Sequence, residues 1–556
     1  MVTLHAYIFR ELSKSFGLSL LALTALFTMG GGLFNILKVE GITAGDIFTV
    51  LPMLLPVVIT LTMPVAALFA ATITYGRLAA DNEFVAARAA GINIHRLFFP
   101  AISLSLFVTL FTLVSVNLVI PGFMKSIELF ALTNIRDLAF NRLAQGGYIH
   151  RDEPGKDRYT LIAQEVLNVA EDQLVAKGFE RPGPDVGYFW VERPTFLMAD
   201  KNGELRRFAV AEGGLVQFNT HDEEIKLTLY VKSARVFDGK HVVEPEFQKI
   251  GPFTTEIPFT PKPSMVNLST LSRWKAAPWE APKIAERLRG FLREAQKLIL
   301  RDALVERLSA SGRMTFHDTE GAEYTISVAS AFSAGDRVTL NDVSAVRQPK
   351  PDGTDRPVMR YDARIGKFVS KSEQGHSRIV LELQREDDHR VHEKITHADG
   401  TSTQRERDDY RIEDLIPPSE ILERIEACTP AAVMNQATVL PADPDLERGR
   451  KTLWKQAQEL RRRIKSVLHY RMSFALSALV TILMGAALGV IFRGSRALAA
   501  FGLACIPFAI VALFIAVGKQ MIESESTQHV GPWLIWGGLT LVAAADLVIL
   551  RVGVRR

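Results

Sequence analysis

Cysteine is nearly absent from this sequence. Only Cys428 and Cys505 occur among 556 residues, the first in a polar stretch and the second in an apolar run. Two isolated cysteines provide neither a disulfide framework nor the paired spacing that a zinc site requires. We therefore expect a fold that needs no disulfide and no structural metal.

Enzyme motifs are absent as well. The Gly-Lys pairs at Gly155 and Gly239 lack the upstream glycine of a phosphate-binding loop. His392 is followed by Glu393, but Thr396 stands where a zinc-binding pair would place its second histidine. No Gly-x-Ser-x-Gly nucleophile motif occurs. The sequence therefore predicts no catalytic residue, no metal ligand and no cofactor bound by this chain.

Charged residues are scarce at both ends of the chain and concentrated in the middle. The 65 Lys and Arg residues nearly balance the 61 Asp and Glu residues, which leaves a net charge of +4, and the two signs are interspersed. A nucleic-acid-binding protein would carry a basic patch or stripe instead. We therefore expect no nucleic-acid partner.

The uncharged ends contain six long apolar runs. A helix needs roughly 20 apolar residues to cross the hydrocarbon core of a bilayer, and it must satisfy its own backbone groups because lipid cannot. The six runs cover about residues 16–37, 47–75, 97–123, 472–492, 498–517 and 530–550. We predict six transmembrane helices, three on each side of a large polar region. A cleaved signal peptide is the alternative for the first run, although that run is longer than a usual signal core.

Lysine and arginine are distributed unevenly between the predicted loops. One set of connections, together with both termini, contains most of them, including Arg77, Arg88 and Arg96. Positive residues are enriched on the cytoplasmic side of membrane proteins, so both termini are predicted to be cytoplasmic. With three spans on each side, the polar middle must then face the other compartment.

The middle of the chain alternates apolar and polar residues between turn signals. These patterns extend over about residues 148–259 and 314–383 and predict the strands of a sandwich, jelly roll or open barrel. Charged helical patterns at about 281–311 and 445–468 indicate either a partner surface or an ordinary solvated face. The predicted fold is α-helical in the membrane, with an all-β, jelly-roll-like domain outside it that carries helical insertions. The predicted domains are residues 1–124, 125–468 (one or two lobes) and 469–556.

The segment between the second and third predicted spans is the most informative. Over residues 81–90 it predicts a short helix, with Asp81 or Asn82 as N-cap and Gly91 at its end. Helical spacing places four residues on one face: Glu83, Ala86, Ala87 and Ala90. Small side chains there would let another surface approach closely, with Glu83 as a charged anchor. A helix that merely connects two spans is the alternative, and the spacing does not decide between them.

One acid, Asp546, lies inside the sixth apolar run. An acidic residue within a membrane span is costly and often functional. Asp546 is close to the predicted cytoplasmic end, however, and Arg551 is near enough along the sequence to help neutralise it. A structural ion pair is the preferred interpretation.

Two strings of residues resemble a known family. Residues 76–92, Gly-Arg-Leu-Ala-Ala-Asp-Asn-Glu-Phe-Val-Ala-Ala-Arg-Ala-Ala-Gly-Ile, look like the coupling segment of the LptF/LptG permeases of lipopolysaccharide export. Residues 469–476, His-Tyr-Arg-Met-Ser-Phe-Ala-Leu, are similar to the family's re-entry into the membrane. The order of three spans, a β-rich domain and three more spans is similar too. The resemblance covers about residues 9–216 and 453 to the end, and residues 281–440 have no counterpart that these motifs match.

The resemblance implies an inner-membrane half-transporter with a periplasmic domain. In this family two permeases pair, a cytoplasmic ABC ATPase dimer binds ATP and pushes on their coupling helices, and a lipopolysaccharide-like lipid passes to a periplasmic bridge protein. Glu83 occupies the position of the family's coupling glutamate, within the set Asp81, Glu83, Ala86, Ala87, Ala90 and Gly91. Lys38 is the candidate for contact with the lipid's phosphates, or else an ordinary interfacial lysine. A membrane-anchored periplasmic receptor or scaffold without transport activity is the alternative function.

Overall fold

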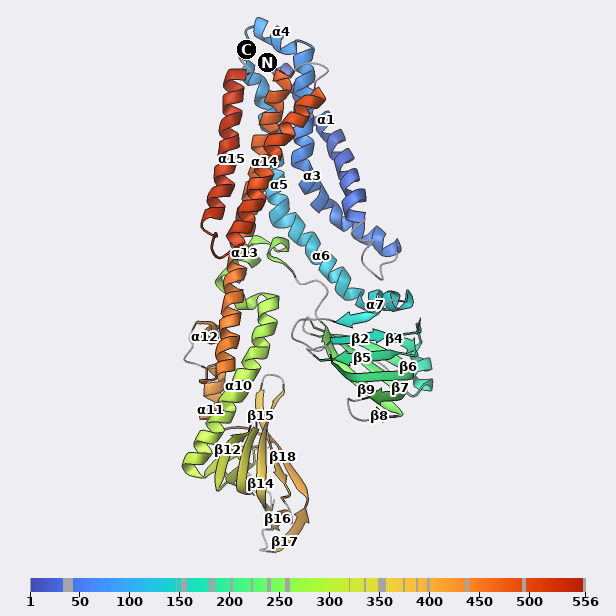
Figure 1. Cartoon of the computed structure of the whole chain (residues 1–556), viewed down its shortest axis with the longest axis vertical. Coiled ribbons are helices and arrows are strands. Elements are labelled where there is room, and N and C mark those ends of the chain that lie inside the picture. The colour runs from blue at the N-terminus through green and yellow to red at the C-terminus, as the bar shows by residue number, and fades with distance from the viewer. Residues whose placement is uncertain are drawn as a thin grey trace. The chain divides into compact units, whose positions relative to one another are not determined.

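The computed structural model of the chain separates into two compact units. One contains Met1–Ser272 and Arg462–Arg556, and the other contains Arg273–Arg461. The structure describes residues 2–33, 44–146, 148–151, 158–179, 186–200, 204–221, 224–237, 242–255, 261–319, 321–334, 337–348, 357–373, 376–386, 389–397, 401–435, 440–492 and 497–553. Figure 1 shows the helices and strands of each unit.

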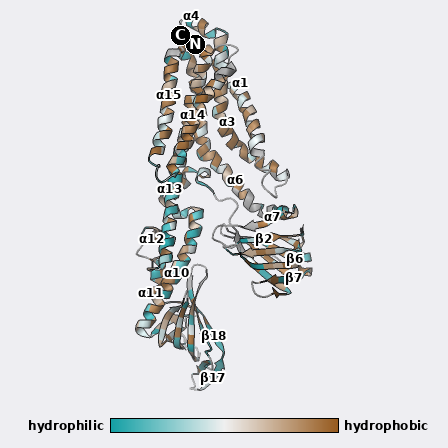
Figure 2. Cartoon of the chain, in the orientation of Figure 1, coloured by the Kyte–Doolittle hydropathy of each residue, from teal (hydrophilic) through white to brown (hydrophobic). Residues whose placement is uncertain are grey.

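The first unit contains five of the membrane helices in full and, from Arg462 on, the apolar part of a sixth that begins in the second unit at Pro444. Within the described residues, six helices are long and apolar enough to cross a bilayer, which confirms the predicted number. They are Thr3–Gly31, Ile47–Ala80, Ile94–Ile127, Pro444–Ile491, Phe501–Glu523 and Val530–Arg551. Figure 2 shows their apolar character, except in the first part of Pro444–Ile491, which is hydrophilic. The first begins well before the predicted residue 16, because Arg10 and Lys14 are good helix formers that continue the helix beyond its apolar part.

The helical elements that make up these spans and their connections follow one another along the chain. In chain order they are α1 (Val2–Phe27), η1 (Thr28–Leu33), α3 (Ala44–Ala80), α4 (Glu83–Ala89), η2 (Ile94–Phe98), α5 (Phe99–Val114), η3 (Ser115–Val119), α6 (Ile120–Thr133), α7 (Ile135–Ala144), α13 (Pro444–Ile491), α14 (Ala497–Glu523), α15 (Val530–Val548) and η8 (Ile549–Gly553). Helix α13 runs without interruption from a polar segment into the fourth span. The η1, η3 and η8 segments are π-helical.

Small and hydroxyl-bearing residues hold the membrane helices together. Gly489 of α13 packs so closely on α3 that an added Cβ would lie 2.5 Å from the carbonyl oxygen of Thr72. Between α1 and α3, the hydroxyls of Thr24 and Thr62 are 3.1 Å apart, and Thr74 donates to Ser15 Oγ at 3.2 Å. Close backbone approach and interhelical hydrogen bonds are the main sources of helix association where lipid surrounds the protein.

Asp546 does not form the ion pair with Arg551 that the sequence suggested. Its side chain is buried at 4% exposure, and among the described residues its Oδ1 has no hydrogen-bond partner. Within that part of the chain no ion pair joins Asp546 to Arg551, which is exposed. The predicted pair is therefore wrong, because residues five apart on a helix lie on different faces, unlike residues three or four apart.

Within the described residues, the first unit also contains an antiparallel sheet of nine strands. Its strands are β1 (Ile149–Arg151), β2 (Arg158–Ile162), β3 (Glu165–Leu167), β4 (Val186–Glu192), β5 (Thr195–Ala199), β6 (Leu205–His221), β7 (Glu224–Phe237), β8 (Val242–Val243) and β9 (Phe247–Thr255). The long strand β6 pairs with β7 along one edge and with β5 and then β4 along the other. Helix α8 (Glu171–Ala176) lies between β3 and β4 in the sequence. Alternating apolar residues from these strands form a separate core with α7.

The described part of the second unit combines another antiparallel sheet of nine strands with helices. Its strands are β10 (Arg313–His317), β11 (Glu323–Ser327), β12 (Ser330–Ala334), β13 (Arg337–Gln348), β14 (Val358–Glu373), β15 (His376–Gln384), β16 (Val391–Thr396), β17 (Ser402–Arg407) and β18 (Asp409–Leu415). Its helices include α10 (Pro282–Ser311), α11 (Ser419–Glu426) and α12 (Pro430–Asn435). Pro282 at the first turn and Gly312, in the left-handed conformation at φ 65°, account for the bounds of α10.

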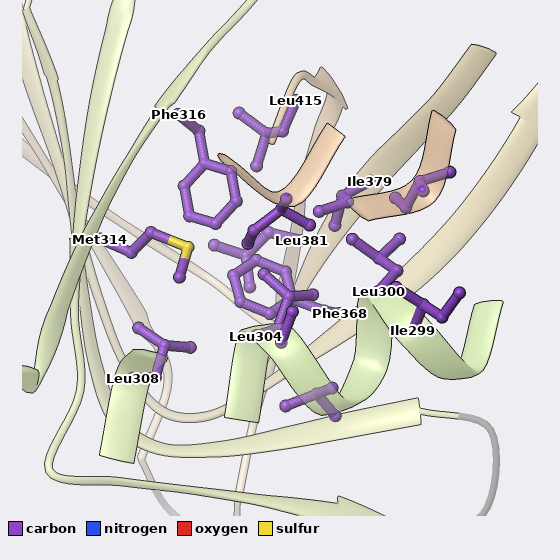
Figure 3. Packing of buried hydrophobic residues seen from close by; sticks show 14 of the residues in the cluster. Ile299, Leu300, Leu304, Leu308, Met314, Phe316, Phe368, Ile379, Leu381 and Leu415 are labelled. Carbon is purple, nitrogen blue, oxygen red and sulfur yellow. The ribbon is translucent and has the colours of Figure 1, made fainter. Parts of the chain in front are cut away.

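The core of the second unit lies between α10 and its sheet. Leu300 and Leu304 of α10 point toward Phe316, Phe368 and the neighbouring strand residues (Figure 3). The rings of Phe316 and Phe368 have centroids 5.4 Å apart. The charged helical pattern at 281–311 therefore has a buried apolar stripe as well as a solvated face.

The thiol of Cys428 belongs to this core. It is buried at 3% exposure, and burial raises its pKa above the ordinary value, so the reactive thiolate is rarer than in an exposed cysteine. In a Cys505→Ser background, we expect a maleimide at pH 7.5 to label Cys428 at least ~100-fold more slowly in the folded chain than in the denatured chain. The matched control moves the thiol one residue, to the exposed position of Ala427, with Cys428→Ala and Ala427→Cys. Equal labelling rates for the two variants would contradict the buried position.

Candidate coupling site

The short helix α4 follows α3 after a two-residue turn. Asn82 adopts the left-handed conformation, with φ 57° and ψ 19°, and its carbonyl accepts the first helical hydrogen bond from Ala86 N–H at 3.0 Å. Asn82 is the N-cap residue of α4, but its side chain makes no capping hydrogen bond. The predicted N-cap position is therefore confirmed at Asn82. A capping residue is usually extended, whereas Asn82 uses its tolerance for the left-handed region to reverse the chain.

Gly91 ends α4, as its position predicted. It has φ 77°, its N–H bonds to the carbonyl of Arg88 at 2.9 Å, and the N–H of Ile92 reaches back to the carbonyl of Ala87 at 3.0 Å. This pair of bonds is the Schellman motif, which needs a residue with positive φ and favours glycine. Both ends of α4 are thus set by local backbone geometry.

The inner face of α4 packs against the membrane helices. Phe84 and Ala87 are buried at 5% and 8% exposure. The Phe84 ring lies 6.1 Å from that of Tyr75, near the end of α3, and 6.4 Å from that of Phe98, just before α5. Tyr75 and Phe98 stack at 5.2 Å. These three rings, here named the aromatic cluster, connect α4 to the second and third spans.

The hydroxyl of Tyr75 strengthens the same junction. Tyr75 is fully buried, donates to the carbonyl of Leu97 at 2.8 Å and accepts from the N–H of Ala101 at 3.3 Å. The N–H of Ala101 lies in the first turn of α5, where helix donors lack partners within the helix. The end of α3 and the start of α5 are therefore joined by hydrogen bonds as well as by ring packing.

The outer face of α4 carries small side chains. Ala86 and Ala90 are exposed, as is Val85, whose side chain is 50% exposed. Glu83 is half-buried at the boundary between the two faces and accepts a hydrogen bond from the Tyr7 hydroxyl of α1 at 3.3 Å. Ala87 does not share the exposed face with Ala86 and Ala90, because Phe84 turns its side of the helix inward.

Helix α1 is held to this region by charge as well. Arg77, in the last turn of α3, forms an ion pair with Glu11 at 2.7 Å, and Lys14 lies 3.6 Å from the same carboxylate. Together with the bond between Tyr7 and Glu83, this pair ties α1 to both ends of the turn between α3 and α4. The region is a connected set of three spans and one short helix.

Comparison with protein families gives one match over nearly the whole chain. The family described as lipopolysaccharide export system permease LptF/LptG matches residues 6–289 and 281–551. The chain belongs to the LptF/LptG family. It is thereby an inner-membrane permease component of a transport system. Comparison with curated proteins finds no match.

The extent of the match corrects one expectation from the motifs. The second matched segment includes residues 281–440, for which the quoted strings of the LptF/LptG family offered no counterpart. The long middle of the chain is therefore within the region that the family describes. Strings of coupling and re-entry residues could not reveal this, because they lie only in and beside the membrane helices.

Lys38 lies outside the described residues, so its contact with lipid stays a prediction. Phe84, Tyr75 and Tyr7 were not predicted from the sequence, although the structure places all three around the coupling segment. Phe84 carried a usable signal: it is the one aromatic residue within an Ala-rich helix, three residues before Ala87.

Proposed function

We propose that this chain is the permease subunit of an ATP-driven exporter of lipopolysaccharide or a related glycolipid, and that α4 receives a separate cytoplasmic ABC ATPase dimer. The observation that carries the proposal is the two-sided character of α4. Its outer face offers Ala86 and Ala90 for close approach, while its inner face is anchored by Phe84. A helix that merely joined two spans would need neither feature.

The packing around α4 supports a route for mechanical coupling. A displacement of α4 by the ATPase would move Phe84 against Tyr75 and Phe98, and so reach the second and third spans. It would also reach the first span through the bond between Glu83 and Tyr7. Closely packed side chains transmit such displacements because protein interiors have low compressibility. ATP itself would be bound by the partner, which fits the lack of a phosphate-binding loop in this chain.

The same proposal specifies the remaining partners. A second permease of the family would complete the path through the membrane, in either a homodimer or a heterodimer. Both termini would lie in the cytoplasm and the polar middle in the periplasm, in agreement with the positions of Lys and Arg. The extracted lipid would pass to a periplasmic bridge protein. Mass spectrometry of the complex purified in mild detergent should therefore recover a small ATPase and a six-span permease.

Substitutions on the outer face of α4 test the docking role. We expect Ala86→Trp and Ala90→Trp to abolish co-purification of the ATPase, because an indole would hold the two surfaces apart.

Glu83→Ala should leave the permease folded but lower ATP-driven lipid release from reconstituted vesicles by about 10-fold or more, the scale at which one positioned charged contact operates. Lipid release and ATPase recovery are measured on the same preparations.

A control of the same chemical kind is available on this chain. Glu171→Ala removes an exposed acid from α8, away from the membrane helices in sequence, and should change neither measurement. If both tryptophan variants retained the ATPase, α4 would be a simple connector. Recovery of the wild-type chain with periplasmic partners alone would favour a membrane-anchored receptor or scaffold without transport activity.

A further inference from the structure

Arg471 is a buried cation on α13, immediately before the apolar part of the fourth span. Only 3% of the surface of Arg471 is exposed. Nη1 donates to the side-chain oxygen of Asn117 at 3.2 Å. Nη2 donates to two backbone carbonyls, those of Ser264 at 3.1 Å and Val266 at 2.7 Å. One side chain thus joins three segments that are far apart in sequence.

The acceptors around Arg471 are all neutral. In the part of the chain that the structure describes, no carboxylate pairs with this guanidinium. A guanidinium stays protonated in proteins, and a buried charge is costly unless hydrogen bonds surround it. An apolar residue would fill the same place without that cost. The hydrogen bonds of Arg471 therefore serve to fix the positions of the segments that it joins, rather than to raise the free energy of unfolding.

Each acceptor is itself fixed in place. Asn117 lies in the π-helical segment η3, and its Nδ2 donates to the carbonyl of Leu113 at 2.8 Å, which leaves Oδ1 to face Arg471. The carbonyls of Ser264 and Val266 belong to the connector, defined here as residues 263–266, which contains the 3-10 turn η4 (Pro263–Met265). Short π-helical segments within longer helices are frequent at functional positions.

We propose that Arg471 is a positioning residue that locks the connector onto the third and fourth spans. The planar guanidinium reaches acceptors on two other segments at once, which the single ammonium of lysine does not reproduce. The connector follows β9 in the sequence and precedes the polar helix α9 (Leu268–Ala276). The lock makes the connector, η3 and α13 move as one body. Its consequence for lipid export rests on the proposed function, but the lock itself does not.

Electron paramagnetic resonance distances test the lock on the permease alone. With Cys428→Ala and Cys505→Ala as background, spin labels are attached after Lys125→Cys on α6 and Lys262→Cys before the connector, both at exposed positions. We expect one narrow distance distribution. Arg471→Met should increase the width of this distribution at least twofold, and Asn117→Leu should increase it less. Arg471→Lys should give a width between those of the wild-type chain and Arg471→Met. An unchanged distribution in Arg471→Met would overturn the lock.

Controls separate the lock from misfolding and from the proposed function. Arg448→Met removes a 77% exposed arginine from the same helix and should leave the distribution narrow. Asn117→Leu keeps the arginine, so it tests the lock even if Arg471→Met fails to fold. In vesicles with the ATPase, Arg471→Met should lower lipid release at least 10-fold while the ATPase stays bound; normal release despite a broadened distribution would overturn the role in export. If the wild-type chain itself exported no lipid but the distributions still differed, the proposed function would fail and the lock would stand.

Discussion

The Gly489→Val substitution should prevent α13 from packing against α3 in its native position. A Cβ at residue 489 would lie 2.5 Å from the carbonyl oxygen of Thr72 and 3.1 Å from the backbone nitrogen of Gly76. Both atoms belong to the backbone of α3, so no side-chain rotation relieves the clash, and the helices must separate. Overpacking typically costs about 1–3 kcal/mol, and a clash with backbone lies at the upper end of that range or beyond it.

The expected result is a lower midpoint of thermal unfolding in detergent and a smaller folded fraction on size-exclusion chromatography. Gly537→Val is the matched control, because that residue is also a glycine of a membrane helix and nothing lies within 4 Å of the added Cβ. Helix propensity and added apolar volume change equally in both variants, so only the contact with α3 differs. Equal midpoints for the two variants would show that α13 and α3 do not approach as closely as described.

The contact between α13 and α3 also affects the proposed coupling through α4. Thr72 and Gly76 are in the last turns of α3, close in sequence to Tyr75 and to the turn at Asn82. Separation of α13 from α3 would therefore disturb the aromatic cluster as well as the helix pair. We expect Gly489→Val to weaken recovery of the ATPase even in the fraction that remains folded, whereas Gly537→Val should not.

The membrane helices could be predicted from the sequence because their signal is local. A run of roughly 20 apolar residues is sufficient evidence for a span, and the turn at Gly91 follows from glycine's access to positive φ. The direction in which α4 faces could not be predicted from small residues alone. It depends on Phe84, whose ring finds Tyr75 and Phe98 only once three separate segments have come together.

The contacts of Arg471 could not be predicted from the sequence either. The sequence places Arg471 beside an apolar run, where an interfacial arginine that reaches for headgroups is the ordinary expectation. Its actual acceptors are Asn117 and the connector, both more than two hundred residues away along the chain. The predicted ion pair of Asp546 was wrong for the opposite reason. Asp546 is close to Arg551 in sequence, but helical geometry does not bring the two side chains together.

In the second unit, Phe316→Ala should destabilise the sheet more than any exposed substitution. Phe316 of β10 has no exposed surface, and its ring packs 5.4 Å from that of Phe368 on β14 (Figure 3). Truncation of a fully buried phenylalanine removes its transfer free energy and leaves a cavity, at a combined cost of about 3–5 kcal/mol. The loss should extend across the sheet, since β10 is joined to β14 through β11 and β13.

Hydrogen exchange measured by mass spectrometry on the full chain in detergent can detect this loss locally. Amides of β11, β13 and β14 should exchange about 100-fold faster or more, because their protection reflects the free energy of opening the unit. Phe332→Ala on β12 is the control: its side chain is 47% exposed, so the same truncation should change exchange several-fold at most. Exchange in the first unit should stay unchanged in both variants, since Phe316 and Phe332 both belong to the second. Equal acceleration by the two substitutions would mean that the core does not depend on Phe316, and that α10 and the sheet are held together by the remaining leucines and isoleucines alone.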